Sequence, residues 1–367
     1  MNHPGLFVLP IILLLIAVEQ PGARAEDLSP KYRAMTDKAL QWLVQQQHKD
    51  GHWETPGGQF TTAMTGLAGT ALLMQGSTMR DGKYAKNIRE AVAYLREHTQ
   101  GSGLIGEVNA PSRGLGYLHG HGYALLFLAQ VYGEEEDAEH RRKLHDLLTR
   151  AVQFTCKAQT SRGGWGYVSA LDGNDWDEGS VSVTQVQALR AARNAGIAVP
   201  RGVIDKVHQY LAKGTTSEGG VIYSLANPLG YGGQPRPSIT VAAIASMFSA
   251  GEYNSPLPRR WLKFVQPVVP LESVGRDQFG HSEYTHYYYA QVIYMLGEDG
   301  YEKLFPGSAP GDRLTWSRYK KAFFEYLAHS QQKDGNWIGT SIGPVYTTSC
   351  YLTILQLDKG ALPIYQR

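Results

Sequence analysis

A sixfold alternation of two kinds of helical stretch, separated by glycine-rich turns, constrains the fold of this chain more than any other feature. Each turn follows a charged stretch, such as 38–44 or 203–211, in which apolar residues recur at three- and four-residue steps. This is the pattern of a helix with one solvated side. The turns recur about every 50 to 60 residues, the second being weaker and the fifth degenerate. They are marked by Gly51, Gly103, Gly163, Gly219, Gly275 and Gly335.

The stretch after each turn is nearly uncharged, and a helix that is apolar or small on all sides is buried on all sides. No single unit could bury such a helix, so neighbouring units must stack on it. An open superhelix would leave one face of every such helix wet. The sequence therefore predicts an all-α fold, an α/α toroid in which about six inner helices are surrounded by about six outer ones. The predicted inner helices are 61–75, 120–132, 180–194, 238–250, 284–296 and 345–357.

The N-terminal segment predicts export. Residues 5–18 are apolar but too short for a membrane span, which needs about 20 residues. Ala23, Arg24 and Ala25 then form the small-x-small pattern of a signal peptidase site. We predict a signal peptide over 1–25, cleaved after Ala25, a periplasmic or extracellular location, and a single toroid domain over 26–367 without a transmembrane segment. The alternative is an uncleaved N-terminal anchor.

Composition narrows the possible partners. A net charge of +2 with 19% charged residues offers no basic surface for nucleic acid, so no such partner is expected. The two cysteines, Cys156 on an outer and Cys350 on an inner helix of a distant unit, are predicted to be too far apart for a disulfide. The chain has no Gly-x-Ser-x-Gly elbow, phosphate-cradling loop or dinucleotide fingerprint, so no serine hydrolase and no cofactor is predicted.

Two of the turns carry a motif that resembles a known repeat. A Gln-rich helix end precedes Asp-Gly-x-Trp at Asp50 to Trp53 and again at Asp334 to Trp337, which is similar to the repeat of the terpenoid cyclase and protein prenyltransferase superfamily. The stretches 119–122, 180–197 and 362–367 resemble exported bacterial proteins called prenyltransferase/squalene oxidase repeat proteins. The resemblance covers nearly all of 26–367 and implies an α/α toroid. It implies no single activity, because this fold hosts cyclases, transferases, thioester domains and binding modules.

In such a ring every inner helix begins at the same end, so residues far apart in the sequence converge around one mouth. The positive ends of the inner-helix dipoles also point there and favour an anionic ligand group. The aromatic residues among those converging are predicted either to form a wall that holds an apolar or cationic ligand or to pack between helices. The residues predicted to bind a ligand at the mouth are Tyr117, His119, His121, Trp176, Arg236, Glu283, Tyr284, His286, Tyr287, Tyr288 and Tyr346.

Asp175, Asp177 and Glu178 form the candidate catalytic cluster. Clustered carboxylates cannot all ionise cheaply, so one could keep its proton and act as an acid. Resemblance to the Asp-x-Asp-Asp motif of squalene-cyclising enzymes implies that Asp177 stands in the place of the Asp that protonates an alkene. In the exported subfamily a single acid precedes Ser-Val, and Glu178 fits that place. The alternative is that these acids cap a helix, in a wet setting where neither is a strongly raised acid.

No metal site is predicted. His119 and His121 are two residues apart, do not share a helix face and have no Cys or Asp beside them at ligand spacing. They are predicted to be turn residues that form hydrogen bonds. The zinc site of protein prenyltransferases uses Asp, Cys and His, but Cys350 has no Asp two residues before it.

Three functions follow as hypotheses, and the sequence leaves open whether the protein is an enzyme. The first is an exported binding protein whose cavity takes an apolar, isoprenoid-like or extended ligand, or an anionic small molecule or peptide. The second is an isoprenoid cyclase or transferase with Asp177 or Glu178 as general acid. The third is a carbohydrate-active toroid, because paired carboxylates beside aromatic residues also suit sugars. Trp53, Trp165 and Trp337 are predicted to be structural wedges.

Overall fold

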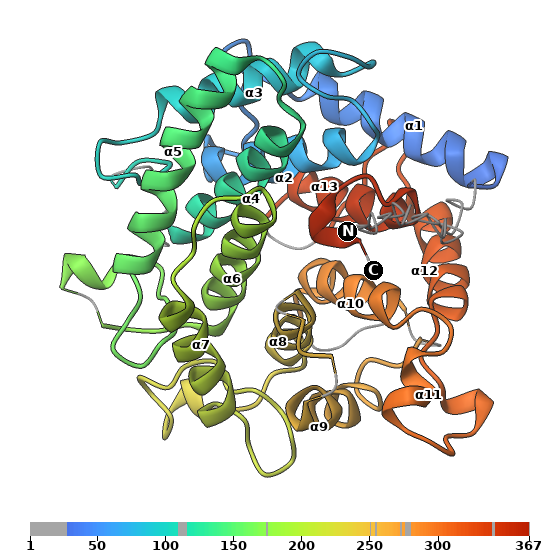
Figure 1. Ribbon diagram of the computed structural model, residues 1–367. Coiled ribbons are helices and arrows are strands. Elements are labelled where there is room, and N and C mark those ends of the chain that lie inside the picture. The colour runs from blue at the N-terminus through green and yellow to red at the C-terminus, as the bar shows by residue number, and fades with distance from the viewer. Residues whose placement is uncertain are drawn as a thin grey trace, which may run out of the picture.

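A computed structural model describes residues 28–108, 116–173, 175–249, 251–253, 255–271, 274–275, 280–339 and 342–366. The predicted signal peptide, residues 1–25, lies outside the described residues. Within them the chain forms helices and isolated β-bridges but no strand. Figure 1 shows an inner ring of helices surrounded by an outer ring, so the predicted all-α toroid is confirmed.

The six inner helices coincide with the predicted ones to within two residues at each end. Nearly every side chain in them is buried, as their lack of charge requires. Each contacts the next around the ring, and the last contacts the first, so the ring is closed. The inner helices are α2 (Thr61–Met74), α4 (Leu118–Glu134), α6 (Gly179–Asn194), α8 (Pro237–Ser249), α10 (Ser282–Leu296) and α13 (Pro344–Leu355).

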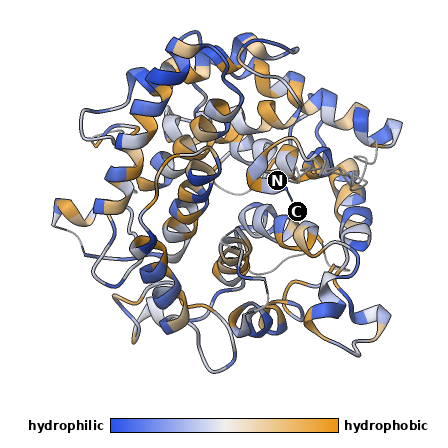
Figure 2. Ribbon diagram, in the orientation of Figure 1, coloured by the Kyte–Doolittle hydropathy of each residue, from blue (hydrophilic) through white to orange (hydrophobic). Residues whose placement is uncertain are grey.

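The outer helices correspond to the charged stretches. Hydrophilic and hydrophobic residues alternate along them (blue and orange in Figure 2), so that their apolar sides pack on the inner ring. The short helix α11 (Gly300–Leu304) lies between α10 and the last outer helix. The outer helices are α1 (Pro30–Gln45), α3 (Ala85–Glu97), α5 (Ala138–Lys157), α7 (Arg201–Lys213), α9 (Pro256–Val265) and α12 (Trp316–Ser330).

The same hydrogen-bonded turn connects outer to inner helices in each of the five repeats whose turn lies wholly within the described residues. In the first repeat the N–H of His48 donates to the carbonyl of His52 at 2.8 Å, and the N–H of Gly51 donates to the carbonyl of His48 at 2.9 Å. The N–H of Trp53 then donates to Thr65 Oγ1 on α2 at 3.0 Å. The equivalent turns begin at Gln100, Thr160, Thr216 and Gln332.

The glycine of each turn lies against the next outer helix. Gly51 has φ +98, and a Cβ there would stand 2.3 Å from the carbonyl oxygen of Glu90 on α3. Gly335 has φ +110 and packs in the same way on Lys38 of α1, which closes the outer ring. The amide of Gln331 reinforces the closure by donating to the carbonyl of Met35 at 2.9 Å. Only glycine combines this φ with such a close approach.

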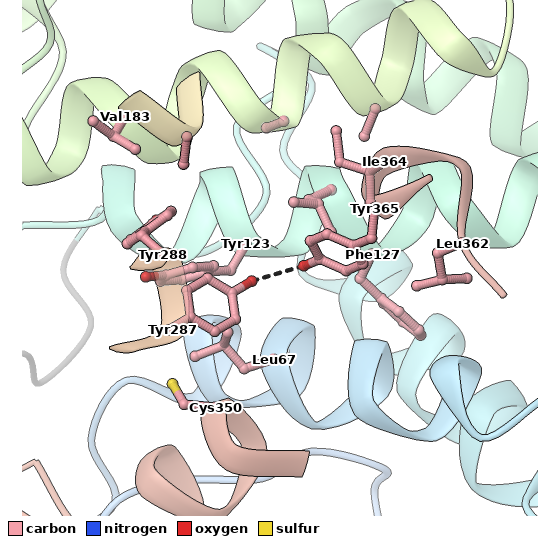
Figure 3. Close-up of a cluster of buried hydrophobic side chains, with 14 of the residues drawn as sticks. Leu67, Tyr123, Phe127, Val183, Tyr287, Tyr288, Cys350, Leu362, Ile364 and Tyr365 are labelled. Carbon is pink, nitrogen blue, oxygen red and sulfur yellow. Dashed lines mark hydrogen bonds between the residues drawn. The ribbon is translucent and has the colours of Figure 1, made fainter. Parts of the chain in front are cut away.

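The middle of the ring is filled by tyrosines and by the C-terminal segment. Tyr287 and Tyr288 of α10 meet Tyr123 of α4 there (Figure 3). The C-terminal segment 362–365 returns over the ring, and its Tyr365 hydroxyl lies 2.8 Å from that of Tyr287. Tyr365 is only 3% exposed, so the last described turn of the chain is part of the core.

Among the described residues no helix is both long and apolar enough to cross a bilayer. Cys156 lies on α5 and Cys350 on α13, the outer and inner positions predicted for them, and both are free thiols.

Candidate functional site

Glu178 stands at the N-terminus of α6 and caps that helix. Its Oε1 accepts the N–H of Ser180 at 3.0 Å, and its Oε2 accepts the N–H of Val181 at 2.9 Å. Its extended backbone is held by a hydrogen bond from its own N–H to the carbonyl of Trp165 at 2.8 Å. This is the arrangement of a side-chain N-cap, so the expectation that one acid of the cluster caps the third inner helix is confirmed.

The surroundings of Glu178 are dry, and the expected wet setting is wrong. The side chain is 0% exposed. The turn of the next repeat covers it, because the N–H of Gly179 donates to the carbonyl of Tyr223 at 2.9 Å and the Tyr223 hydroxyl lies against the carboxyl group. Burial raises the pKa of Glu178, while hydrogen bonds from Ser180 and from the N–H of Val181 oppose that rise. The next repeat thus shields Glu178 from water, although the polar residues around it in the sequence suggested an exposed site.

His119 reaches the same carboxyl group through Ser180. Its Nε2 lies 3.1 Å from Ser180 Oγ, which donates to Glu178 Oε2 at 2.5 Å. Loss of hydration lowers the pKa of His119 to about 4, so the imidazole is neutral at pH 7. Because Ser180 gives its hydrogen to Glu178, Nε2 of His119 carries the hydrogen of the second bond. A serine nucleophile must donate its hydroxyl hydrogen to the imidazole, whereas here the imidazole donates to the serine. His119 and Ser180 are therefore not arranged as a nucleophile and its base.

Two tyrosines extend the chain of hydroxyl groups. The hydroxyls of Tyr167 and Tyr223 lie 2.6 Å apart, and both side chains are partly exposed. Burial raises the pKa of Tyr167 to about 12, with the nearby charge of Glu178 adding to the rise. The same two causes raise the pKa of Tyr223 further. Both phenols therefore stay protonated, and because one hydroxyl donates to the other, at most one of the two hydrogens is left for a ligand.

Arg236 completes the group of residues that we call the mouth cluster: His119, Tyr167, Glu178, Ser180, Tyr223 and Arg236. Its guanidinium carbon lies 4.0 Å from the ring centroid of Tyr223 and 4.2 Å from that of Tyr231. The two rings meet at 62°, so they form a corner that holds the guanidinium group by cation–π attraction. Among the described residues no carboxylate oxygen lies within 4.0 Å of the Arg236 guanidinium nitrogens, and Arg236 is partly exposed.

Both carboxylate oxygens of Asp177 accept hydrogen bonds that hold neighbouring loops together. Asp177 is 0% exposed, and its Oδ2 accepts Arg162 Nε at 2.7 Å while its Oδ1 accepts the N–H of Leu225 at 2.7 Å. Asp175 lies outside, where its carboxylate accepts the N–H and the hydroxyl of Ser161. The hydrogen bonds from Ser161 lower the pKa of Asp175. Arg162 pairs with both Asp175 and Asp177, whereas Glu178 lies at the separate site described above, so the three acids do not form one cluster.

Three residues predicted at the mouth face the outer ring instead. His121 is buried; its Nδ1 accepts the N–H of Ile105 at 3.1 Å and its Nε2 lies 2.8 Å from Thr155 Oγ1 of α5. His286 pairs with the Tyr319 hydroxyl of α12, and Tyr117 donates to Asp172 on the neighbouring loop. The prediction that they line the mouth is thus corrected.

The reason is visible at His121, which takes the inner-helix position that Thr or Ser holds in four other repeats. That position accepts the N–H of the residue after the turn, as Ser182 does from Trp165 at 2.8 Å. Burial lowers the pKa of His121 to about 3, so it is a neutral acceptor. His121 is thus a structural hydrogen-bond partner.

The other predicted aromatic residues face the middle of the ring. Tyr284, Tyr287, Tyr288 and Tyr346 are buried there, and burial raises the pKa of each, that of Tyr288 to about 12. Glu283 lies beside them but is 2% exposed, with the Thr347 hydroxyl of α13 donating to it at 3.3 Å. Trp176 is 40% exposed on the loop before α6 and outside the mouth cluster.

Sequence reasoning missed Ser180, Tyr167 and Tyr223 as members of the cluster. A usable pattern was present for the tyrosines, because each stands two residues after the turn-closing residue of its repeat, Trp165 or Val221. Equal offsets in consecutive repeats place side chains side by side on one end of the ring.

A hollow lies on the outer surface, between α3 and α5. Its volume is about 780 Å³, and it is lined by charged residues such as Arg89 and His140. Arg80 and Glu136 pair beside it with more than two fifths of each side chain exposed. This groove is a solvated seam between repeats, and it lacks the buried acid and ordered aromatic residues of the mouth cluster.

Replacing Glu178 with Gln is expected to change how stability depends on pH. The folded-state pKa of Glu178 is raised, so its contribution is fully present below the unfolded-state pKa, about 4.3, and is lost as pH rises through the folded-state pKa. Urea unfolding at pH 4 and pH 8 should therefore show the Gln variant gaining relative to the parent at the higher pH. The control is Glu139→Gln on α5, whose exposed carboxylate has its pKa lowered by Lys143 and should give a small opposite trend. Parallel pH profiles for parent and Glu178→Gln would contradict the role of burial.

Comparison with known proteins supports the fold. No protein-family model and no curated protein matches the chain. An inactive variant of the GH76A α-1,6-mannanase of Salegentibacter, in complex with α-1,6-mannotriose, superposes with a TM-score of 0.60 at 10% identity, covering 89% of this chain and 98% of that one. The type II terpene cyclase MstE from Scytonema, in complex with geranylgeranyl dihydroxybenzoate, gives 0.54 at 14% identity, covering 90% and 98%. At such identities the likeness shows a common α/α toroid fold.

Proposed function

We propose that this protein is an exported binding protein of the terpenoid-cyclase-like and prenyltransferase-like repeat type. Its ligand has an apolar, isoprenoid-like or extended body and an anionic group, and it binds at the mouth of the ring. The domain spans 26–367, and the segment 1–25 is removed on export. Fractionation of the native host tests the export, because an uncleaved anchor would keep the protein in the membrane fraction.

The observation that carries this proposal is Arg236. Its guanidinium group is held by Tyr223 and Tyr231 with no carboxylate beside it among the described residues. A cation fixed in this way is pre-organised to bind a carboxylate or phosphate with two hydrogen bonds. The hydrogen-bonded phenol pair of Tyr167 and Tyr223 can supply at most one further donor, and the N-termini of α6 and α8 add positive potential.

The apolar body would meet the aromatic residues in the middle of the ring. Tyr284 and Tyr288 are buried there, and their hydroxyls interact with each other and with Tyr123 and Thr184. Deep entry requires Tyr365 to move away from Tyr287, so the C-terminal segment would limit how far the ligand penetrates.

Backbone strain at the start of two inner helices supports the same location. Phe60 before α2 has φ 56 and ψ 32, and His281 before α10 has φ 49 and ψ 43. Left-handed conformations of bulky residues are costly, about 1–3 kcal/mol each, and cluster at binding sites. Both residues lie at the same end of the ring as the mouth cluster, because all inner helices begin there.

An isoprenoid cyclase with Glu178 as general acid is the second candidate. It is favoured by the full burial of Glu178 and by the raised pKa of its carboxyl group. The Scytonema terpene cyclase binds a ligand that joins a geranylgeranyl chain to a benzoate, which is the combination of apolar and anionic parts proposed here. Asp177 is less suited than Glu178, because both of its carboxylate oxygens already accept hydrogen bonds from the framework.

A carbohydrate-active toroid is the third candidate, and the fold likeness to a mannanase fits it as well as the second. Hydrolysis of a glycosidic bond needs two carboxyl groups about 5–10 Å apart on one substrate site. Glu178 is the one carboxyl group of the mouth cluster, since Asp177 is paired with Arg162 and Asp175 faces solvent. Hydrolysis of a glycoside at the mouth cluster therefore has less support than binding of an amphiphilic anion, although the fold likeness supports a sugar ligand and an isoprenoid ligand equally.

Arg236→Gln is expected to weaken binding of an anionic isoprenoid about 10- to 100-fold, because a charge-assisted hydrogen bond contributes roughly 1.5–3 kcal/mol. Geranylgeranyl diphosphate serves as the probe and geranylgeraniol as its neutral counterpart, with binding followed by calorimetry. The neutral alcohol should bind both proteins equally. Arg201→Gln, on the exposed side of α7, is the matched control. Equal affinities of the parent and Arg236→Gln for the diphosphate would refute the proposal, and native mass spectrometry of host-purified protein would then identify what co-purifies.

A further inference from the structure

We propose that the first turn of the ring is a binding site for a divalent transition-metal ion, with His48, His52 and Glu54 as ligands. One donor atom from each lies within 4.8 Å of the others. The three residues come from a single turn between α1 and α2. The site is separate from the mouth cluster, and the proposal does not depend on the proposed function.

The carboxylate of Glu54 joins the two imidazoles. Its Oε2 lies 3.2 Å from His52 Nε2, and its Oε1 lies 3.7 Å from His48 Nε2. The other nitrogen of the same imidazole, His52 Nδ1, lies 2.6 Å from Asp50 Oδ1. A metal-binding histidine commonly gives its second ring hydrogen to such a carboxylate, which fixes the tautomer and turns the free lone pair toward the metal. With its Nδ1 hydrogen given to Asp50, His52 presents the lone pair of Nε2 toward Glu54, the arrangement that two ligands of one cation would take.

The other repeats show that the turn does not need these side chains to fold. The same pair of backbone hydrogen bonds closes the turns that begin at Gln100, Thr160, Thr216 and Gln332, at 2.8 to 3.0 Å. The positions equivalent to His48, His52 and Glu54 are held by Gln100, Leu104 and Gly106 in the second repeat, Thr160, Gly164 and Gly166 in the third, Thr216, Gly220 and Ile222 in the fourth, and Gln332, Asn336 and Ile338 in the sixth. The donor set of the first turn is therefore additional to what the fold requires.

The site combines a rigid base with an open side. His52 is 12% exposed and its ring packs on Tyr94, which in turn stacks on His98. His48 is 47% exposed and its ring lies over that of His52, with centroids 4.3 Å apart and planes 14° apart. One metal cannot lie in both ring planes at once, so binding requires the His48 ring to rotate. Its imidazole makes no closer polar contact than the one to Glu54, so little opposes that rotation.

Two imidazoles and one carboxylate are borderline ligands, which suit Zn²⁺, Cu²⁺ or Ni²⁺ better than Mg²⁺ or Ca²⁺. Three protein ligands leave at least one coordination position of Zn²⁺ for water or an incoming ligand. The exposed side of His48 is where that position would open. The candidate is therefore a solvent-accessible site of the kind that can hold an exchangeable ligand.

The test uses the full-length protein without an affinity tag, stripped with a chelator and titrated with Zn²⁺ by calorimetry. We expect one equivalent to bind. His48→Gln, Glu54→Ile and the triple change His48→Gln/His52→Asn/Glu54→Ile install the residues of the sixth repeat and so preserve the turn. Each single change should weaken binding at least tenfold, and the triple change should abolish the one-equivalent phase. Asp50→Asn should weaken binding about 10- to 100-fold, as outer-shell changes do.

His140→Ala/His145→Ala on α5 is the control for nonspecific binding by exposed histidines and should leave the titration unchanged. Circular dichroism checks the fold of each variant, and the single change at exposed His48 keeps the test decisive if the triple variant unfolds. Failure of the parent protein to bind Zn²⁺, or equal binding by the triple variant, would overturn the proposal.

Discussion

Replacement of Trp165 by alanine is expected to lower the free energy of unfolding by about 3–5 kcal/mol, the range for removal of a large buried aromatic side chain. Trp165 is 0% exposed and is held on three sides. Its indole Nε1 donates to the carbonyl of Thr155 on α5 at 2.8 Å, and its own N–H donates to Ser182 Oγ on α6 at 2.8 Å. Its carbonyl accepts the N–H of Glu178 at 2.8 Å. The residue therefore joins an outer helix, an inner helix and the capping acid, and urea unfolding followed by circular dichroism measures its loss.

Leu171→Ala provides the comparison, because this side chain is 62% exposed on the nearby loop and its removal should change stability by less than about 0.5 kcal/mol. Trp53 and Trp337 make the same indole bond to their own outer helices, to Leu43 and Leu327. Their alanine variants should fall in the same range as Trp165→Ala. An unchanged melting temperature for Trp165→Ala would show that it is no wedge and would reopen a role in ligand contact.

Arg162→Met is expected to cost roughly 3 kcal/mol, the lower end of the range for breaking a buried ion pair, since Arg162 itself is 35% exposed. The change leaves the carboxylate of Asp177, which is 0% exposed, without its cation and with the neutral partners Leu225 N–H and Tyr210 hydroxyl. Equilibrium unfolding in urea measures the loss. Arg201→Met, which removes an exposed pair with Asp205 on α7, should cost less than about 1 kcal/mol.

The stability of the Arg162→Met variant also tests whether Asp177 is available to act as a general acid. A large loss means that Asp177 is part of the framework that holds the loop before α6 to the turn of the next repeat. The modest loss of stability expected when a helix cap is removed, about 0.5–2 kcal/mol, then applies to replacement of Glu178 and not to replacement of Asp177. A loss below about 0.5 kcal/mol for Arg162→Met would show that Asp177 does not rely on this pair, and would return it to the list of candidate acids.

The sequence alone was sufficient for the architecture. Stretches such as 61–74 and 345–357 contain no charged residue, and burial of such a helix on every side requires neighbours on every side. A closed double ring satisfies this requirement, and the observed inner helices follow the uncharged stretches closely. The cap of α6 was also predictable, because an acid directly before Gly179 and Ser180 has free N–H groups within reach whatever lies around it.

The sequence could not predict which way each side chain near the mouth points, because this depends on contacts made in the folded structure. An inner helix is buried all round, so its sequence does not distinguish the face toward the ring centre from the face toward the outer helices. His121 and His286 turned outward because Thr155 on α5 and Tyr319 on α12 offer them partners there. The dryness of Glu178 arose in the same way, from Tyr223 in the next repeat. Local composition cannot report contacts made by residues some 45 positions away.

The same reason explains the two least expected features. The C-terminal segment 362–365 enters the core because the ring leaves room beside Tyr287 and Phe127 for one more aromatic side chain, a space that exists only after the ring has closed. The donors of His48, His52 and Glu54 converge because the Gly51 turn folds back on itself. Periodicity and charge determined which segments are helices and in which layer they lie, since those properties depend on burial averaged over a whole segment. Packing between repeats determined which atoms meet, since that depends on the position of each side chain relative to residues distant in the chain.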